Sequence, residues 1–157
     1  MKTSLTAYFC AFIVLLTVFS CSEDESPADM GAPNETSVAD EILRLVNEHR
    51  QNQGLASLEK NTTAQQLAID HTNYMIDQGR ISHDGGDAKF QKLKEEENAQ
   101  GFGENVASGQ DSAQSVMTGW LNSTGHRQNI EGNYTHIGIG AIKDSQGRYY
   151  YTQIFYR

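Results

Sequence analysis

Three side chains in this 157-residue chain could do chemistry together, and each lies among glycines and small polar residues. His83 occurs in the segment Ser-His-Asp-Gly-Gly, Glu104 in Gly-Phe-Gly-Glu-Asn, and His126 in Ser-Thr-Gly-His-Arg. As neutral imidazoles, His83 and His126 could bind Zn²⁺ together with the carboxylate and leave a coordination position for a nucleophilic water. Without a metal, a carboxylate next to an imidazole supports acid–base catalysis. Alternatively, Glu104 only accepts hydrogen bonds that tie loops together.

These residues can meet only through the fold, because 21 positions separate His83 from Glu104 and 22 separate Glu104 from His126. Helical patterns with polar caps predict helices over 38–54, 62–78, 87–97 and 113–121. Alternating and aromatic residues predict a weaker strand over 104–107 and two strands over 136–142 and 149–156, joined by a turn at 144–147. Helices followed by a terminal hairpin predict an α+β fold with helices packed on a small sheet.

The ordered set of motifs resembles the CAP superfamily of cysteine-rich secretory proteins, antigen 5 and pathogenesis-related proteins, and within it the bacterial SCP-like branch. The similarity spans about residues 40–156. It includes the segments Val46-Asn47-Glu48-His49-Arg50, Ile81-Ser82-His83, Gly103 to Gly109, Trp120 to Asn129, and Ile137-Gly138-Ile139-Gly140. The resemblance implies a three-layer α-β-α sandwich with a small central antiparallel sheet, and a cleft where two histidines and one or two glutamates meet.

The resemblance also implies that the trio lies in this cleft. His83 and His126 match the two cleft histidines of the family, and Glu104 matches the glutamate of its Gly-Glu-Asn motif. The second glutamate of many members falls near Ser123, where this chain has no acid. A Ser123-His126-Glu104 triad is disfavoured because no nucleophile elbow surrounds Ser123.

Other polar residues of the same motifs are candidates for the site. We predict that Asn105, Ser123 and Asn129 bind ligand; alternatively, the two asparagines satisfy buried backbone groups. Trp120 and His71 lie on apolar helix stripes. We therefore predict that Trp120 is part of the core and that His71 is a packed, hydrogen-bonded histidine.

The first 37 residues predict a signal peptide and a tether. An apolar run over 7–19 follows Lys2 and is shorter than the roughly 20 residues of a membrane span, which predicts a secretory signal over 1–20. The segment Val18-Phe19-Ser20-Cys21 resembles a bacterial lipobox, so we expect lipidation of Cys21; the alternative is an ordinary signal peptide cut nearby. Residues 21–37 contain five acidic and no basic side chains, which predicts a disordered tether to a domain over 38–157.

The amino-acid composition excludes some classes of partner and of reaction. The chain has 20 acidic and 12 basic residues and a net charge of −8, which argues against nucleic acid as a partner. Its two cysteines, Cys10 and Cys21, precede the domain and exclude a disulfide or a cysteine nucleophile within it. Together with the predicted signal segment, the resemblance to the CAP superfamily implies an extracytoplasmic binding module for a lipid, glycan or peptide, anchored through Cys21 at the outer membrane or cell surface. The alternatives are a metal-assisted, endopeptidase-like hydrolase that uses the trio, and a non-catalytic scaffold.

Overall fold

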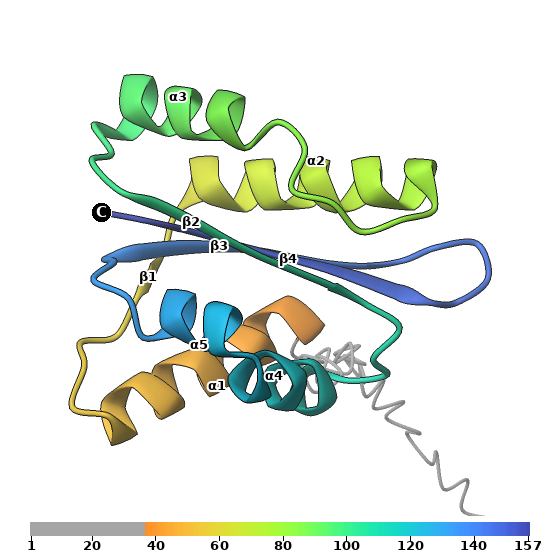
Figure 1. Ribbon diagram of the computed structural model, residues 1–157, viewed down its shortest axis with the longest axis horizontal. Helices are drawn as coiled ribbons and strands as arrows, with labels where there is room; N and C mark the ends of the chain where they lie inside the picture. Colours follow the sequence, from red (N-terminus) through yellow and green to blue (C-terminus); the bar gives the residue numbers. More distant parts are fainter. Residues whose placement is uncertain (1–36) are drawn as a thin grey trace, which may run out of the picture. The chain divides into compact units, whose positions relative to one another are not determined.

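A four-stranded sheet lies between two layers of helices in the computed structural model, which describes residues 37–157 (Figure 1). The strands follow the order β1-β3-β4-β2 across the sheet. Their bounds are Glu59–Lys60 for β1, Phe102–Ser108 for β2, His136–Lys143 for β3 and Tyr149–Tyr156 for β4. The expected three-layer α+β fold is confirmed. The sheet is mixed rather than wholly antiparallel, because the two-residue β1 pairs parallel to β3.

Two helices cover one face of the sheet and three cover the other (Figure 1). The first layer contains α2 (Thr62–Gln78) and α3 (Gly86–Glu97); the second contains α1 (Val38–Asn52), α4 (Ala113–Asn122) and α5 (Thr124–Ile130). Four of these helices confirm the sequence prediction, whereas α5 has a single buried residue, Ile130, and no apolar period that would reveal it. Within 37–157, no helix is long and apolar enough to cross a membrane.

Local capping residues mark the helix ends. The side chain of Ser37 accepts a hydrogen bond from the backbone N–H of Asp40 and caps α1. Ser112 caps α4 in a reciprocal capping box with Ser115. Gly79 ends α2 in the left-handed region at φ 64°, where glycine avoids the steric cost that other residues incur. Local sequence thus sets where these helices begin and end.

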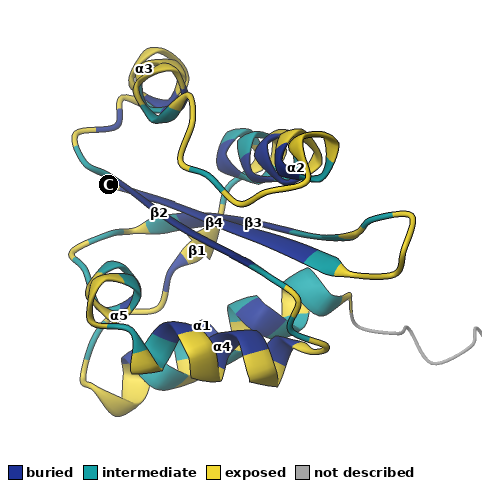
Figure 2. Cartoon of the chain, turned by 45° about the vertical axis from the view of Figure 1, so that its right-hand side comes forward, coloured by how far each residue is buried: buried dark blue, intermediate teal, exposed yellow. Residues whose placement is uncertain are grey.

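Strand β4 lies at the centre of the core, and all of its residues from Tyr150 to Tyr156 are buried. Tyr151 and Phe155 pack into the cluster that contains Trp120 of α4, whereas Ile154 and Tyr156 pack into the cluster that contains the alanines of α2. Figure 2 shows that the buried residues concentrate in the sheet and on the helix sides that face it. The predicted core position of Trp120 is confirmed, since its side chain is fully buried.

The predicted signal peptide over 1–20, the lipidation site Cys21 and the tether up to 36 lie outside the described residues. Ser37, the last residue of the predicted tether, caps α1. The structure therefore describes the predicted domain but not the predicted anchor.

Candidate functional site

Glu104 is the centre of a buried polar cluster. Its Oε1 accepts a hydrogen bond of 2.8 Å from Nδ1 of His83, and its Oε2 accepts one from Nζ of Lys89. Nε2 of His71 lies 3.8 Å from the same Oε1. Glu104 and Lys89 are buried, whereas the side chain of His83 is 59% exposed. The cluster therefore joins an interior ion pair to a histidine that solvent can reach.

Four different elements bring the cluster together. Glu104 lies in β2, Lys89 in α3 and His71 in α2, while His83 lies in the loop between the two helices. Nε2 of His71 donates a hydrogen bond of 2.8 Å to the carbonyl oxygen of Ser82. Because a carbonyl only accepts, this ring nitrogen carries the hydrogen. His71 is thus packed and hydrogen-bonded, as predicted, and it holds the loop that carries His83.

The hydrogen bond to Glu104 also assigns the tautomer of His83. A carboxylate accepts, so Nδ1 of His83 carries a hydrogen. When the ring is neutral, its Nε2 is an acceptor, and no hydrogen-bond partner of this atom occurs among residues 37–157. Burial lowers the pKa of Lys89, and its hydrogen bond and charge interaction with Glu104 oppose this shift. An oriented imidazole with one free nitrogen can take up a proton or accept a hydrogen bond from a ligand.

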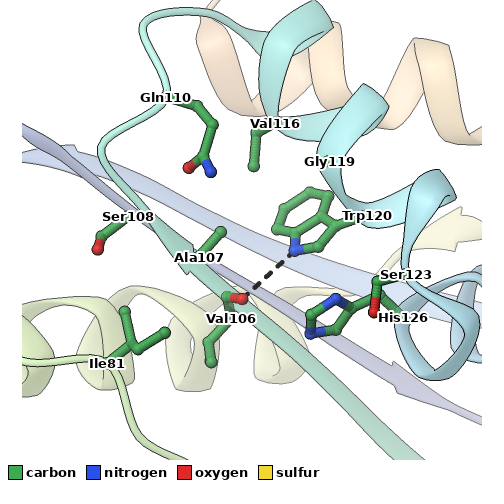
Figure 3. A pocket seen from close by; sticks show the side chains of 10 residues that line it. All are labelled: Ile81, Val106, Ala107, Ser108, Gln110, Val116, Gly119, Trp120, Ser123 and His126. Atoms are coloured by element: carbon green, nitrogen blue, oxygen red, sulfur yellow. Dashed lines mark hydrogen bonds between the residues drawn. The ribbon is translucent and has the colours of Figure 1, made fainter.

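His126 belongs to α5, and its ring faces a groove (Figure 3). Burial lowers the pKa of His126, and charge on His83 lowers it further. The ring is therefore neutral at pH 7, because the ordinary histidine value is already 6.5.

Two of the predicted ligand-binding residues are engaged in holding α5 against β2. Nδ2 of Asn105 donates to the backbone carbonyl of His126 at 3.1 Å. Nδ2 of Asn129 donates to Oδ1 of Asn105 at 2.8 Å and to the carbonyl of Glu104 at 3.1 Å. Asn105 has no exposed surface. These amides position His126, whereas Ser123, the third predicted residue, lines the groove.

The groove has a volume of about 260 Å³ and crosses one edge of the sheet (Figure 3). Ile81, from the loop after α2, lines it together with residues 106–108 of β2 and Trp120 of α4. The remaining lining residues are Gln110, Val116, Gly119, Ser123 and His126. Ile81 is 48% exposed, an unusual position for a large aliphatic side chain. The groove therefore has an apolar floor with polar groups around it.

The cluster does not fit a metal centre as it is arranged. Within residues 37–157, no group of three or more His, Cys, Asp or Glu side chains is placed to hold a metal ion. The Lys89 ammonium occupies one oxygen of Glu104, and Nδ1–H of His83 occupies the other. A divalent cation at this carboxylate would have to displace a buried positive charge.

Comparison with known proteins assigns the chain to a family. The model of the cysteine-rich secretory protein family, CAP, matches residues 43–155 and so covers both helical layers and the sheet. The chain belongs to the CAP family. As a CAP domain it is similar in structure to an extracellular SCP-domain protein of Bacillus anthracis, with 30% identity and a TM-score of 0.66. That match covers 76% of this chain and 40% of the other.

A further bacterial protein is similar to the CAP domain in sequence, and another shares its fold. It is 33% identical over 117 residues to YkwD of Bacillus subtilis, which covers 71% of this chain and 46% of YkwD. An outer surface protein of Borrelia burgdorferi shares the fold, with 21% identity, a TM-score of 0.67 and coverage of 74% and 89%. This chain spans less than half the length of YkwD and of the B. anthracis protein.

The structure brings part of the predicted trio into contact and adds two residues to it. His83 and Glu104 bond directly, whereas His126 lies at the groove. Sequence reasoning did not place Lys89 or His71 beside the glutamate. Lys89 lies four residues before the buried Leu93 and so shares its helix face, a signal that could have indicated burial.

Proposed function

We propose that this CAP domain is an extracytoplasmic binding module. Its groove takes up an apolar part of the ligand, and the imidazoles of His83 and His126 meet a polar group at the rim. The observation that carries the proposal is the apolar groove between Ile81 and Trp120, which is also lined by the imidazole of His126. His83 follows Ile81 by two residues in the same loop. Such a combination of an apolar surface with a few placed polar groups is typical of binding sites. The extracellular and outer surface proteins that share the fold support the location.

Blocking the groove tests this proposal. Gly119 lines the groove from α4, and an added Cβ there meets only Nε2 of Gln110, at 4.0 Å. The variant Gly119→Leu should therefore fold and fill the groove. Thr118→Leu adds the same side chain to an exposed position of the same helix and serves as the matched control. Arrays of peptides, glycans and phospholipids should retain the unaltered chain and the control but lose Gly119→Leu; equal retention of all three proteins would refute the groove.

The bond between His83 and Glu104 favours a hydrolase as the second candidate. In such a reaction, free Nε2 of His83 would take a proton from water while the oxygen attacks a peptide carbonyl. The same nitrogen would return the proton to the leaving amine as the C–N bond breaks. Glu104 orients the ring through the hydrogen bond of 2.8 Å.

A peptide-cleavage assay separates this reaction from binding alone. A quenched fluorogenic peptide library should be cleaved by the unaltered chain and not by His83→Ala, with the melting temperatures nearly equal. His136→Ala, which removes a histidine outside the groove and the Glu104 cluster, is the control. If the unaltered chain cleaves nothing, or if His83→Ala cleaves at the same rate, the domain is not this hydrolase. A chain that neither binds nor cleaves is a scaffold.

We also propose that the chain is attached to a membrane through acyl groups on Cys21, at the outer membrane or cell surface. The lipobox-like segment Val18-Phe19-Ser20-Cys21 supports this attachment. More than one acyl chain provides stable anchoring. In the native host, Cys21→Ala should move the protein from the membrane fraction to the soluble fraction and abolish labelling by an alkyne fatty acid. Cys10→Ala is the control, and a membrane-bound Cys21→Ala protein would contradict the anchor.

A further inference from the structure

Strand β2 is an edge of the sheet, since it pairs only with β4. Gly101 and Arg157 exchange two backbone hydrogen bonds, and the N–H of Gly109 donates to the carbonyl of Tyr149. Alternate residues of an antiparallel strand face opposite directions in the sheet plane. The odd-numbered residues therefore pair with β4. The N–H and C=O groups of the even-numbered residues from 102 to 108 point to the open edge.

Side chains donate hydrogen bonds to most of the backbone carbonyls that point to the open edge of β2. The hydroxyl of Tyr134 donates to Phe102 at 3.2 Å. Nδ2 of Asn129 donates to Glu104 at 3.1 Å, and the indole N–H of Trp120 donates to Val106 at 3.4 Å (Figure 3). Capping of this kind protects a sheet edge from unwanted pairing.

Ser108 is the exception at this edge. Within residues 37–157, no side chain or backbone group on the open side hydrogen-bonds to its N–H or C=O. It also lines the groove, as does Val106, whose outward N–H lies two residues away on the same edge. The capping of β2 thus ends where the groove begins, and a backbone donor and acceptor remain available there.

Two polar side chains next to Ser108 also lack a full set of partners. In the described part of the chain, the buried Oε1 of Gln110 has no hydrogen-bond partner, although Gln110 lines the groove. Arg148 donates to Oγ of Ser108 at 2.9 Å. No acidic side chain among residues 37–157 forms a salt bridge with Arg148. The site therefore offers an unneutralised positive charge and an unused acceptor.

We propose that the groove binds an extended peptide that pairs with the backbone of Ser108, inserts one apolar side chain and places one carboxylate at Arg148. This inference rests on the proposed binding function and names its ligand class. A peptide residue carries an N–H and a C=O at the spacing that an edge strand presents, which is the basis of β-strand addition. The groove volume of about 260 Å³ lies below the range of roughly 300–1,000 Å³ typical of small-molecule pockets, and so suits a single side chain.

Charge limits the peptide to a single carboxylate at this position. The chain has a net charge of −8, so an acidic run would be repelled by the protein as a whole. Arg148 is the local exception because its guanidinium lies at Ser108 without a carboxylate partner in the described structure. The carboxylate can belong to an acidic side chain or to the peptide C-terminus.

Fluorescein-labelled hexapeptides of Ala and Gly with one Leu, Phe or Trp and one Glu provide the probe. We expect saturable binding to the whole chain and slower hydrogen exchange of the Ser108 amide. N-methylation of the pairing residue should weaken binding about tenfold, because it removes one hydrogen bond and crowds the edge. Arg148→Met should weaken binding of the Glu peptides and leave their Gln counterparts unchanged. Lys143→Met, which removes an exposed cation from β3, is the matched control.

The outcomes separate this inference from the proposed function. If the N-methylated peptides bind as tightly as the parents, or if no peptide binds, the peptide inference is overturned. If phosphatidylglycerol vesicles or glycans bind instead and Gly119→Leu abolishes that binding, the groove still functions, with another ligand. If binding of every probe is unaffected by Gly119→Leu, or if no probe binds, both proposals fail.

Discussion

At the scale of single residues, the site depends on how the charge of Glu104 is balanced. A carboxylate in the interior needs partners, and this one has the ammonium of Lys89 and Nδ1–H of His83. His71 approaches the same oxygen but gives its hydrogen to Ser82. The ammonium of Lys89 therefore offsets the buried charge of the carboxylate, and the carboxylate in turn orients the exposed His83. A charged residue of α3 thereby acts on a group at the surface.

Removing the ammonium should destabilise the domain. Lys89→Met leaves the carboxylate of Glu104 buried without its cation, and breaking a buried pair in this way costs about 3–5 kcal/mol. Urea unfolding at pH 7 measures the loss. Lys92→Met is the matched control in the same helix, because Lys92 pairs with Glu96 on the exposed surface and should change stability by about 0.5 kcal/mol or less. Equal effects of the two variants would show that the buried pair contributes little.

The neutral His126 predicts a pH dependence. Burial and the charge of His83 lower its pKa in the folded state below the ordinary 6.5, so the unfolded chain binds the proton more tightly. The free energy of unfolding should therefore fall as the pH decreases below about 6.5. The comparison of the unaltered chain with His126→Gln between pH 7.5 and 5 isolates this effect, since other groups titrate in both proteins. The unaltered chain should lose more stability than His126→Gln as the pH falls; a constant difference between the two curves would contradict the prediction.

At the scale of elements, close packing against β3 fixes the position of α2, which forms the first helical layer together with α3. Gly138 and Gly140 alternate with Ile137 and Ile139, which pack toward the opposite layer. A Cβ on Gly138 would lie 2.1 Å from the backbone carbonyl of Ala64, and one on Gly140 would lie 2.3 Å from Oγ1 of Thr72. Packing therefore explains the Ile-Gly-Ile-Gly motif. The isoleucine side chains fill the core on one face of β3, and the glycines let the backbone of α2 approach the other face closely.

Gly138→Ala tests this packing. The added methyl group meets backbone atoms that cannot rotate away, so α2 must shift and stability should fall by about 1–3 kcal/mol or more. Gly125→Ala is the control in α5, where nothing lies within 4 Å of the added atom, and it should be neutral or stabilise by up to about 1 kcal/mol through helix propensity. Thermal unfolding followed by circular dichroism measures both. A tolerated Gly138→Ala would show that α2 is not held by this contact.

At the scale of the whole domain, β4 joins both layers, and its tyrosines make the fold sensitive to alkali. No cysteine occurs in residues 37–157, so stability rests on the packed core. Burial raises the pKa of Tyr151 and of Tyr156 to about 12, from 10.0. Their side chains face opposite layers, Tyr151 toward Trp120 and Tyr156 toward Leu93 of α3. Ionising either tyrosine would therefore loosen the core on one side of the sheet.

The raised pKa values predict the direction of the alkaline transition. The unfolded tyrosines release their protons near pH 10 while the folded ones hold them to about pH 12, so stability should be intact below pH 10 and decline as pH rises toward 12. Urea midpoints between pH 9 and 11.5 measure this decline. Tyr151→Phe and Tyr156→Phe should each flatten it. An unchanged slope in both core variants would contradict the assignment.

Local pattern alone determined most of the elements. Four helices are predicted by periodic apolar residues and capping residues, and the terminal hairpin is predicted by alternating apolar residues and a turn. All of these signals act between residues that are close in the sequence. The order of the motifs was also sufficient to indicate the family. The motifs also singled out His83 and Glu104, whose side chains are hydrogen-bonded to each other in the structure. Anchoring at Cys21 remains a prediction from sequence, since that residue lies outside the described part.

Only the tertiary structure decided the features that depend on distant partners. Strand β1 is two residues long and exists because Glu59 and Lys60 pair with His136 and Ile137, far along the chain. The polar α5 is held by the amides of Asn105 and Asn129 rather than by an apolar stripe. The positions of Lys89 and His71 beside Glu104 follow from the meeting of α2 and α3 on one face of the sheet. Likewise, the free edge at Ser108 depends on which carbonyls the neighbouring helices reach. These outcomes depend on long-range contacts, and periodicity along the chain records only which residues are apolar, not which ones meet.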